Sequence, residues 1–429
     1  MNTEQCPHIV VLGAGFGGLT FCQTFRHAEA RITVIDRQNH HLFQPLLYQV
    51  ATAGLSAPEI AQPIRSILSD QPNVRVLMDE VREIRLGERA VVLRDRPEPV
   101  GYDYLIIALG GVTTYFGHPE WEALAPGLKS LEDAVRIRRR VLLAFERAEM
   151  EPDPAVQRRL MTIVVVGGGP TGVELAGAFS ELSRNVLRTD FRRIDPTRAR
   201  VVLIEASPVV LSNFPKDLGE NATQTLREMG VEVHTSAKVK ALSEGRVELD
   251  TGEVIEAETV LWAAGVGANP LTRTLGVAVD RAGRIQAAPD CSLPGHPEAF
   301  AIGDLVSLVQ EDGRPVPGVS PAAMQMARHV ARLIEQDLAS PGGVPAAERP
   351  PFRYWDKGSM ATIGRSAAVA YLRDFHLTGM TAWFAWLLVH LLFLIGFRNK
   401  LAVFLQWTYS YFTYKRGARI ISGVRPGPP

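Results

Sequence analysis

Short, wholly apolar runs that lead directly into glycine-rich turns recur along this chain. Residues 8–12 (HIVVL) are followed by the turn GAGFGG at 13–18, by a helix-forming stretch at 19–27 and by a second apolar run at 31–35, which ends at Asp36. An apolar run of this kind is typical of a parallel β-strand that is covered on both faces. The pattern therefore predicts a strand, a glycine turn, a helix and a second, parallel strand.

The same order returns in the middle of the chain. Residues 161–166 are apolar, GGGPTG follows at 167–172, a helix is predicted at 173–187, and a further strand ends at Glu205. The interval between this turn and its acid is longer than in the first unit, so we expect an insertion around residues 184–198. The repeat of one unit predicts two related domains.

Three further apolar runs, at 103–111, 259–265 and 299–304, end in small residues. Proline and glycine are concentrated at 340–351 (SPGGVPAAERPP), which predicts a linker. Together these elements predict an α/β fold with two Rossmann-like dinucleotide-binding domains, the second inserted in the first, and a separate C-terminal helical element.

A glycine turn between a strand and a helix, with an acid at the end of the next strand, is the arrangement that binds a dinucleotide. Small residues let the backbone approach the pyrophosphate, the helix N-terminus offers free N–H donors, and the acid accepts hydrogen bonds from ribose hydroxyls. The alternative is that both are merely tight turns with a solvated acid, and that Asp304 is a helix cap or turn acid. The predicted dinucleotide-binding residues are Gly13, Gly15, Gly18, Asp36, Gly110 and Asp304 around the first turn, and Gly167, Gly169, Gly172, Glu205 and Gly265 around the second.

Composition and charge exclude several classes of protein. Lys and Arg together number 46, as do Asp and Glu, so no excess of positive charge favours nucleic acid as a partner. The cysteines Cys6, Cys22 and Cys291 are scattered, so we expect neither a disulfide framework nor a metal site nor a reactive cysteine pair. The few, scattered cysteines predict a reducing compartment. The first strand begins close to the first methionine, so we expect no export signal.

The C-terminal part has a different character. Residues 375–429 contain six basic residues and no acid, and residues 380–397 (MTAWFAWLLVHLLFLIGF) are almost wholly apolar. Of the 32 aromatic residues in the chain, 12 lie in 375–414, a density that suits a membrane interface. The alternatives are a hydrophobic dimer interface, a buried helix and a transmembrane span.

Two dinucleotide sites in one chain favour a flavin paired with a nicotinamide, because a hydride can pass directly between their stacked rings. The predicted cofactors are therefore FAD and NADH. We predict an FAD-binding domain at 1–118 and 281–340, an NAD(H)-binding domain at 119–280, and a C-terminal membrane-anchoring region at 341–429.

The glycine motifs occur in the order seen in two-dinucleotide-binding-domain flavoproteins. More narrowly, the chain resembles bacterial type II NADH:quinone oxidoreductase over nearly its whole length. The resemblance rests on residues 36–48 (DRQNHHLFQPLLY), 172–177 (GVELAG), 390–399 (HLLFLIGFRN) and 411–417 (YFTYKRG).

The resemblance implies a single-subunit, non-proton-pumping NADH dehydrogenase that passes a hydride from NADH to FAD and two electrons on to a membrane quinone, ubiquinone or menaquinone. It implies a peripheral enzyme on the cytoplasmic side of the inner membrane, bound to the bilayer surface. It also places Glu174 near the quinone as a proton donor. The family's A-Q-x-A-x-Q motif falls on 320–325, where Gln325 is kept and Ser320 and Pro321 replace the first two residues.

A second function shares the same core motifs. A soluble FAD-dependent NADH reductase of a small redox protein, such as ferredoxin or rubredoxin, would carry the same glycine turns, and its apolar tail would then form a homodimer interface. The sequence of residues 380–414 favours the membrane enzyme.

Overall fold

The computed structural model describes residues 6–27, 29–413 and 417–421, which form two units. The first unit comprises the described residues of Met1–Leu42, Ala61–Val112 and Val266–Lys357. The second comprises those of Phe43–Ile60, Thr113–Gly265 and Gly358–Pro429. The chain thus leaves the first unit and later returns to it, as an inserted second domain requires. Of the basic tail, Lys415, Arg416 and Arg425 lie outside the described residues.

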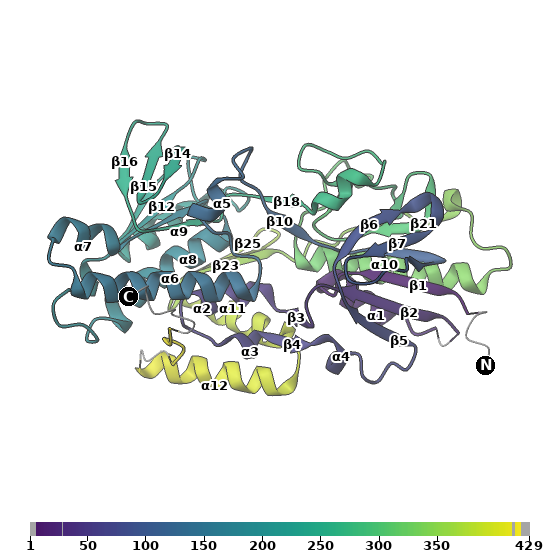
Figure 1. The fold of residues 1–429 in the computed structure, drawn as a ribbon, viewed down its shortest axis with the longest axis horizontal. Coiled ribbons are helices and arrows are strands. Elements are labelled where there is room, and N and C mark those ends of the chain that lie inside the picture. The colour runs from purple at the N-terminus through teal and green to yellow at the C-terminus, as the bar shows by residue number, and fades with distance from the viewer. Residues whose placement is uncertain (1–5, 28, 414–416, 422–429) are drawn as a thin grey trace. The chain divides into compact units, whose positions relative to one another are not determined.

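The first unit is built on a six-stranded sheet with the strand order β20-β21-β9-β1-β2-β5 (Figure 1). All neighbouring pairs are parallel except β20 with β21. The strands are β1 (His8–Leu12), β2 (Arg31–Asp36), β5 (Val74–Met78), β9 (Tyr104–Ile107), β20 (Ser292–Leu293) and β21 (His296–Ala301).

Every residue of β1 is buried, because strands lie on both sides of it and both faces of the sheet are covered. The predicted strands at 8–12 and 31–35 are confirmed. Since β21, β9, β1 and β2 are consecutive and parallel, their carboxyl ends meet at one edge of the sheet. This edge carries the first glycine turn.

Helix α1 (Phe16–Thr24) follows that turn and packs against α10 (Ser320–Ala339). The predicted start at residue 19 was wrong, because the last residues of the glycine turn already form the first helical turn: the N–H of Leu19 donates to the carbonyl of Gly15 at 3.0 Å. The predicted end was also too late, since Phe25 has an extended backbone.

Smaller elements complete the first unit. A three-stranded antiparallel sheet is formed by β6 (Val81–Arg85), β7 (Ala90–Leu93) and β8 (Val100–Gly101). The others are β3 (His40–Leu42), β4 (Ala61–Pro63), α4 (Ile64–Ile67), β10 (Gly111–Thr113), β18 (Val266–Ala268), β19 (Ile285–Gln286) and β22 (Val306–Ser307), with 3₁₀ turns at Leu86–Glu88, Pro270–Thr274 and Ala346–Glu348.

The segment predicted as a linker, 340–351, is fixed to the first unit. The side chain of Arg349 is only 5% exposed and forms ion pairs with Asp337 at 2.9 Å and with Asp290 at 3.5 Å. Phe352, directly after the segment, is buried as well. Proline and glycine indicated an irregular backbone correctly, but a buried ion pair holds that backbone in place.

The second unit is built on a four-stranded parallel sheet with the order β13-β12-β11-β17. Its strands are β11 (Thr162–Val166), β12 (Arg200–Ile204), β13 (Val231–His234) and β17 (Thr259–Trp262). A three-stranded antiparallel sheet of β14 (Val239–Ser243), β15 (Arg246–Leu249) and β16 (Val254–Glu256) adds to it. The remaining helices of its central part are α2 (Leu47–Ala51), α3 (Ala57–Ile60), α5 (Trp121–Leu124), α6 (Leu131–Met150), α7 (Pro154–Leu160) and α9 (Lys216–Glu228), with a 3₁₀ turn at Gln44–Leu46.

Helix α8 (Pro170–Glu181) follows the second glycine turn and begins three residues before the predicted start at 173. The reason is the same as in α1, since the N–H of Val173 donates to the carbonyl of Gly169 at 3.0 Å. A π-helical turn at Leu182–Val186 continues it, and a 3₁₀ turn at Pro196–Arg198 precedes β12. These elements are the insertion that the long interval before Glu205 predicted.

The end of the second unit contains an antiparallel meander that the sequence analysis did not predict. Its strands are β23 (Ser359–Gly364), β24 (Ala367–Leu372) and β25 (Phe375–Thr378), and they are followed by α11 (Gly379–Phe393) and α12 (Phe397–Thr413) (Figure 1). The apolar run at 380–397 is therefore divided between two helices, with Gly396 at a φ of +84° between them. Within the described ranges, no helix has both the length and the apolar character needed to cross a lipid bilayer.

Candidate functional site

The first glycine turn is shaped for close backbone contact. Gly13 has a φ of +93°, and a Cβ atom placed on it would lie 2.5 Å from the carbonyl oxygen of Ala108. A Cβ atom on Gly18 would lie 1.9 Å from the carbonyl oxygen of Gly13. Only glycine fits at these two positions. At Gly15, by contrast, nothing lies within 4 Å of a Cβ atom, so the turn faces open space where a ligand would bind.

The N-terminus of α1 offers hydrogen-bond donors to that space. Its N-cap residue is Gly15, so no side chain caps the first N–H groups of the helix. Uncapped N–H groups and the helix dipole together favour a phosphate group.

Asp36 closes the turn from the end of β2. One carboxylate oxygen accepts the N–H of Ala14 at 2.6 Å, and the other accepts the N–H of Gln38 at 2.8 Å. Each oxygen keeps a second lone pair for a ribose hydroxyl.

His41 contributes to the first turn, and the sequence analysis gave it no role. Its Nδ1 lies 2.9 Å from the carbonyl oxygen of Ala14, and its ring meets that of Phe16 edge-on at 5.2 Å. Burial lowers the pKa of His41, so the ring is neutral and donates from Nδ1. The side chains of Asp36 and His41 thus form hydrogen bonds with the N–H and the carbonyl of Ala14, respectively. His41 belongs to the motif 36–48, on which the resemblance rests, but that motif does not indicate which residue His41 contacts.

Two more predicted residues lie at the same edge of the first unit. Gly110, with a φ of +67°, follows β9, and Asp304 follows β21. Asp304 lies beside the residue that follows Gly110, because a Cβ atom on Gly111, the first residue of β10, would lie 3.4 Å from the Cβ of Asp304. The structure therefore brings Gly13, Asp36, Gly110 and Asp304 to the ends of four adjacent strands, where ligands bind in open α/β sheets.

The second glycine turn repeats this geometry. Gly167 has a φ of +107°, and a Cβ atom on it would lie 2.6 Å from the backbone of Ala263. A Cβ atom on Gly172 would lie 1.8 Å from the carbonyl oxygen of Gly167, whereas the space at Gly169 is open. Gly265 follows β17 at the same edge of this sheet.

Glu205 closes the second turn as Asp36 closes the first. Its two carboxylate oxygens accept the N–H groups of Gly168 and Ser207, each at 2.6 Å. The residue is partly buried, and no arginine follows it in the sequence Ala206-Ser207-Pro208. A carboxylate in this place suits a ribose 2′-hydroxyl and repels a 2′-phosphate.

Glu174 lies on the second turn of α8, next to the C-terminal meander. Burial raises the pKa of its carboxyl well above the usual value, and a hydrogen bond from the backbone of Thr362 opposes this shift. The meander comes this close because Gly177 has no side chain: a Cβ atom there would lie 1.5 Å from the carbonyl oxygen of Ile363. Glu174 is thus a carboxyl group that keeps its proton at higher pH than an ordinary glutamic acid.

Gln325 lies on the second turn of α10 in the first unit. Its amide nitrogen donates to the carbonyl of Trp355 at 3.0 Å, and its amide oxygen accepts the N–H of Trp355 at 3.0 Å. The amide thus binds both backbone groups of one residue in the segment before β23. Pro321 stands in the first turn of the helix, where the missing N–H costs nothing.

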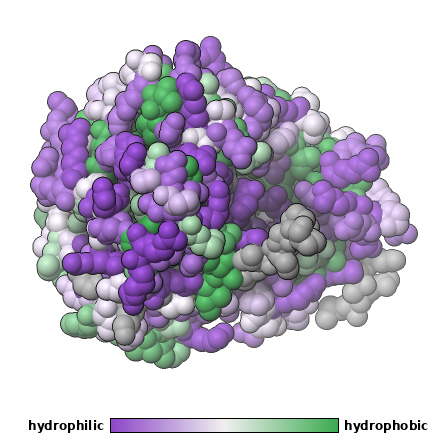
Figure 2. Space-filling view, turned by 60° about the vertical axis from the view of Figure 1, so that its left-hand side comes forward, coloured by the Kyte–Doolittle hydropathy of each residue, from purple (hydrophilic) through white to green (hydrophobic). Residues whose placement is uncertain are grey.

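Helices α11 and α12 leave many large apolar side chains exposed. On α11, Met380, Phe384, Leu388 and Leu392 recur every four residues, on one face of the helix. Figure 2 shows hydrophobic groups at the lower edge of the view, at the height of α12 in Figure 1. The exposed large apolar residues of the two helices are Met380, Phe384, Leu388, Leu392, Phe393, Phe397, Leu401, Phe404, Leu405, Tyr409 and Phe412.

The opposite side of α11 is packed into the second unit. Trp386 is fully buried and stacks on His390, with ring centroids 4.1 Å apart. Burial lowers the pKa of His390 to about 4, so its ring carries no charge at neutral pH. From α12, the indole N–H of Trp407 donates to the side chain of Gln49 at 2.7 Å. The two helices are therefore anchored on one side and apolar on the other.

Two of the three thiol groups, those of Cys22 and Cys291, are unsuited to reaction with an acceptor. Cys22 and Cys291 are buried, and burial raises the pKa of Cys22 to about 12 and that of Cys291 further. The expected packing of Cys22 inside α1 is confirmed.

Comparison with known proteins agrees with this geometry. Residues 7–327 match the model of the pyridine nucleotide-disulphide oxidoreductase family, and residues 356–415 match that of the NDH2 C-terminal domain. Two relatives from Mycobacterium tuberculosis, the type II NADH:quinone oxidoreductases Ndh and NdhA, are each 43% identical. The alignment with Ndh covers 98% of this chain and 92% of the relative, and that with NdhA covers 96% and 89%.

The fold is that of a solved structure of NDH2 from Plasmodium falciparum in complex with NADH. The two share a TM-score of 0.88 at 19% identity, over 96% of this chain and 100% of the other. The chain therefore belongs to the pyridine nucleotide-disulphide oxidoreductase family and, within it, to the type II NADH:quinone oxidoreductases.

Proposed function

We propose that this chain oxidises NADH and reduces a membrane quinone as a single subunit, by way of FAD held in the first unit. The observation that carries the proposal is the presence of two complete dinucleotide turns, each with its own closing acid, in one chain with an apolar C-terminal surface. The overall reaction is NADH plus H⁺ plus quinone to NAD⁺ plus quinol. The match of residues 356–415 to the NDH2 C-terminal domain supports this reaction over the reduction of a small redox protein.

The residues of the first unit fit FAD. The uncapped N-terminus of α1 and the open space at Gly15 would take the pyrophosphate, and Asp36 would accept from the adenosine ribose. Gly110 and Asp304, at the ends of β9 and β21, would hold the flavin half. Bound FAD supplies the ability to accept a hydride and to release two electrons to a quinone.

The second turn would bind NADH. Gly167, Gly169 and Gly172 shape the space for its pyrophosphate, and Gly265 lies at the neighbouring strand end. Glu205 accepts the ribose hydroxyls and, by its charge, disfavours NADPH.

Glu174 would take part in the reduction of the quinone. Because its raised pKa keeps the carboxyl protonated, Glu174 holds a proton that the reduced quinone can take. Gln325 would shape the approach of the quinone by fixing the backbone of Trp355. Pro321 offers no side-chain hydrogen bond, so no quinone contact of that kind is assigned to it.

The exposed face of α11 and α12 would lie in the lipid surface. The enzyme would then be a peripheral protein on the cytoplasmic side of the inner membrane, and its quinone, ubiquinone or menaquinone, would arrive from the lipid. A homodimer through the same face is the competing arrangement. The neutral His390 is the one titratable group in residues 380–397, so we expect no proton relay through the membrane.

An absorbance experiment tests the reaction. The purified protein should show flavin bands that NADH bleaches and that quinone restores. Missing bands, or bands that NADH leaves unchanged, would overturn the enzyme assignment.

A membrane-binding experiment tests the surface. We expect Phe384→Ser with Leu388→Ser to release the protein from membranes, whereas Met150→Ser, an equally exposed apolar residue on α6, should not. Attachment of the unaltered protein should survive a high-salt wash, because each buried large apolar side chain adds roughly 1.5–3 kcal/mol that salt does not screen. A protein that salt releases, or that forms a dimer which the double variant breaks, would favour another role for this face.

A further inference from the structure

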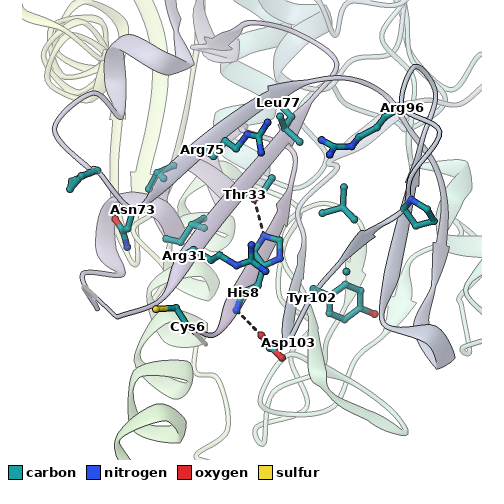
Figure 3. Close-up of a pocket in the computed structure, with 16 residues that line it drawn as sticks. Cys6, His8, Arg31, Thr33, Asn73, Arg75, Leu77, Arg96, Tyr102 and Asp103 are labelled. Atoms are coloured by element: carbon teal, nitrogen blue, oxygen red, sulfur yellow. Dashed lines mark hydrogen bonds between the residues drawn. The ribbon is translucent and has the colours of Figure 1, made fainter. Parts of the chain in front are cut away.

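The first unit contains a cleft away from its glycine turn. The cleft has a volume of about 660 Å³ and lies between the first residues of β1, β2 and β5 and the loop at 94–99 that joins β7 to β8 (Figure 3). Strands β1 and β2 run from this cleft to Gly13 and Asp36. The cleft and the dinucleotide turn are therefore at opposite ends of the same strands.

Three arginines line the cleft: Arg31 at the start of β2, Arg75 on β5 and Arg96 in the loop. The side chains of Arg75 and Arg96 point toward one another across the cleft (Figure 3). Arg31 and Arg75 are exposed, and Arg96 is partly buried.

These three arginines lack the acidic partners that two nearby arginines have. Arg89 and Arg94, which directly precede and follow strand β7, form ion pairs with Glu298 and Glu80, respectively. Arg31, Arg75 and Arg96 form no ion pair with any residue that the structure describes. Facing guanidinium groups without an acid repel one another, and an anion between them turns that repulsion into attraction.

The acid and the histidine in the cleft wall have partners of their own, and neither forms an ion pair with the three arginines. Among the described residues that line the cleft, Asp103 is the one acid, and its carboxylate accepts the backbone N–H of His8 at 2.7 Å. The ring of His8 is bound to the hydroxyl of Thr33 at 2.8 Å. Burial and the nearby Arg31 lower the pKa of His8, so this ring stays neutral.

Apolar residues form another part of the wall. Ile32, Val74, Leu77 and Pro99 line the cleft beside the arginines. Guanidinium groups bind phosphate oxygens in pairs, and the apolar wall suits an organic group attached to the phosphate.

We propose that this cleft binds a small phosphorylated compound, with its phosphate groups between Arg75 and Arg96 and within reach of Arg31. The site uses none of the residues assigned to FAD, NADH or quinone. It is therefore an anion site separate from the two glycine turns.

Calorimetric titration of the full-length, FAD-loaded protein with inorganic tripolyphosphate tests the proposal. The titration is made at physiological ionic strength with saturating NAD⁺, so that the nicotinamide site is already filled. We expect saturable binding that weakens at least about tenfold in Arg75→Gln and in Arg96→Gln and is lost in the double variant, because each charge-assisted pair of hydrogen bonds is strong.

Arg82→Gln is the matched control, since Arg82 is exposed on β6 and does not line the cleft. This control should bind like the unaltered protein, and all variants should keep their flavin and their rate of NADH oxidation. The proposal is overturned if the unaltered protein shows no saturable binding, if NAD⁺ abolishes it, or if the double variant binds normally.

Discussion

The two glycine turns share one geometry, but the helices that follow them meet different neighbours. Counted from Gly13 and Gly167, Thr20 of α1 corresponds to Glu174 of α8, and Gln23 corresponds to Gly177. Thr20 is buried and Gln23 is exposed. In α8 the corresponding positions carry an acid with a raised pKa and a glycine that touches β23.

This difference shows what the C-terminal meander adds to the fold. Helix α1 packs against α10, and the one role that we assign to it is to form the glycine turn at its N-terminus. The first residues of helix α8 belong to its glycine turn. Gly177, further along the helix, contacts the meander, and this contact brings the backbone of Thr362 to Glu174. The same local unit thus forms a glycine turn suited to a dinucleotide in both cases and presents an acid in one.

The largest effects should come from the glycines at the centre of each turn. In Gly18→Ala or Gly172→Ala the new methyl group would overlap a carbonyl oxygen of the turn, at 1.9 Å and 1.8 Å. We expect Gly18→Ala to lose bound flavin, and Gly172→Ala to keep flavin but to lose reduction by NADH at least ~100-fold, the scale of a misplaced reacting group.

Flavin content by absorbance and the rate of flavin bleaching separate these outcomes. Gly87→Ala, where no atom lies within 4 Å of the new Cβ, is the control and should change neither. Equal loss of flavin in both turn variants would show that the two turns do not serve separate dinucleotides.

Gly177→Ala should have the next largest effect. Its Cβ would lie 1.5 Å from the carbonyl oxygen of Ile363, so β23 must move, at a cost of about 1–3 kcal/mol in the free energy of unfolding. We expect a lower melting temperature, faster proteolysis within residues 359–413 and loss of quinone reduction, with reduction of a soluble acceptor retained. Gln23→Ala, at the corresponding exposed position of α1, should change stability by less than about 0.5 kcal/mol. Normal quinone reduction in Gly177→Ala would show that the meander is not needed for that step.

The local pattern was sufficient to predict the two turns and the strands around them. Buried parallel strands are continuous apolar runs, and glycine is required where a Cβ atom would overlap the backbone, so both features are visible in the sequence. The predicted start of each helix was wrong because the turn and the first helical turn share the same residues.

The missed features depend on contacts between residues that are distant in the sequence. His41 holds Ala14, Ile363 lies on Gly177, and Arg349 is buried between Asp290 and Asp337. His41 and Gly177 lie in motifs, but no pattern in the sequence indicates the partner of either residue or of Arg349, because the partner is defined only by the folded chain. The bounds of the domains and the roles of the site residues stay predictions for the same reason.

Glu174→Gln tests the acid that distinguishes α8 from α1. We expect quinone reduction to fall roughly 100-fold, the lower end of the range for loss of a general acid, with flavin reduction by NADH unchanged. Stopped-flow measurement of the two half-reactions separates these steps. Thr20→Val, at the corresponding position of α1, should affect neither step.

The same variant should change how stability depends on pH. Because the pKa of Glu174 is raised in the folded protein, its contribution to stability is complete below the ordinary glutamate pKa of about 4.3 and is lost as the pH rises through the raised value. Glu174→Gln should therefore be relatively more stable than the unaltered protein as the pH increases. Denaturant unfolding at several pH values measures this difference, and a difference that does not vary with pH would contradict the raised pKa.

The smallest expected effect concerns the two acids that close the turns, Glu205 and Asp36. Glu205→Gln removes the charge that repels a 2′-phosphate, so the preference for NADH over NADPH in kcat/KM should narrow by about tenfold, the effect of one nearby unit charge in a partly exposed site. Asp36→Asn removes the matching charge from the first turn and should weaken flavin retention without changing that preference, because Asp36 faces the other dinucleotide. If Asp36→Asn narrowed the preference and Glu205→Gln did not, the assignment of FAD to the first turn and NADH to the second would have to be reversed.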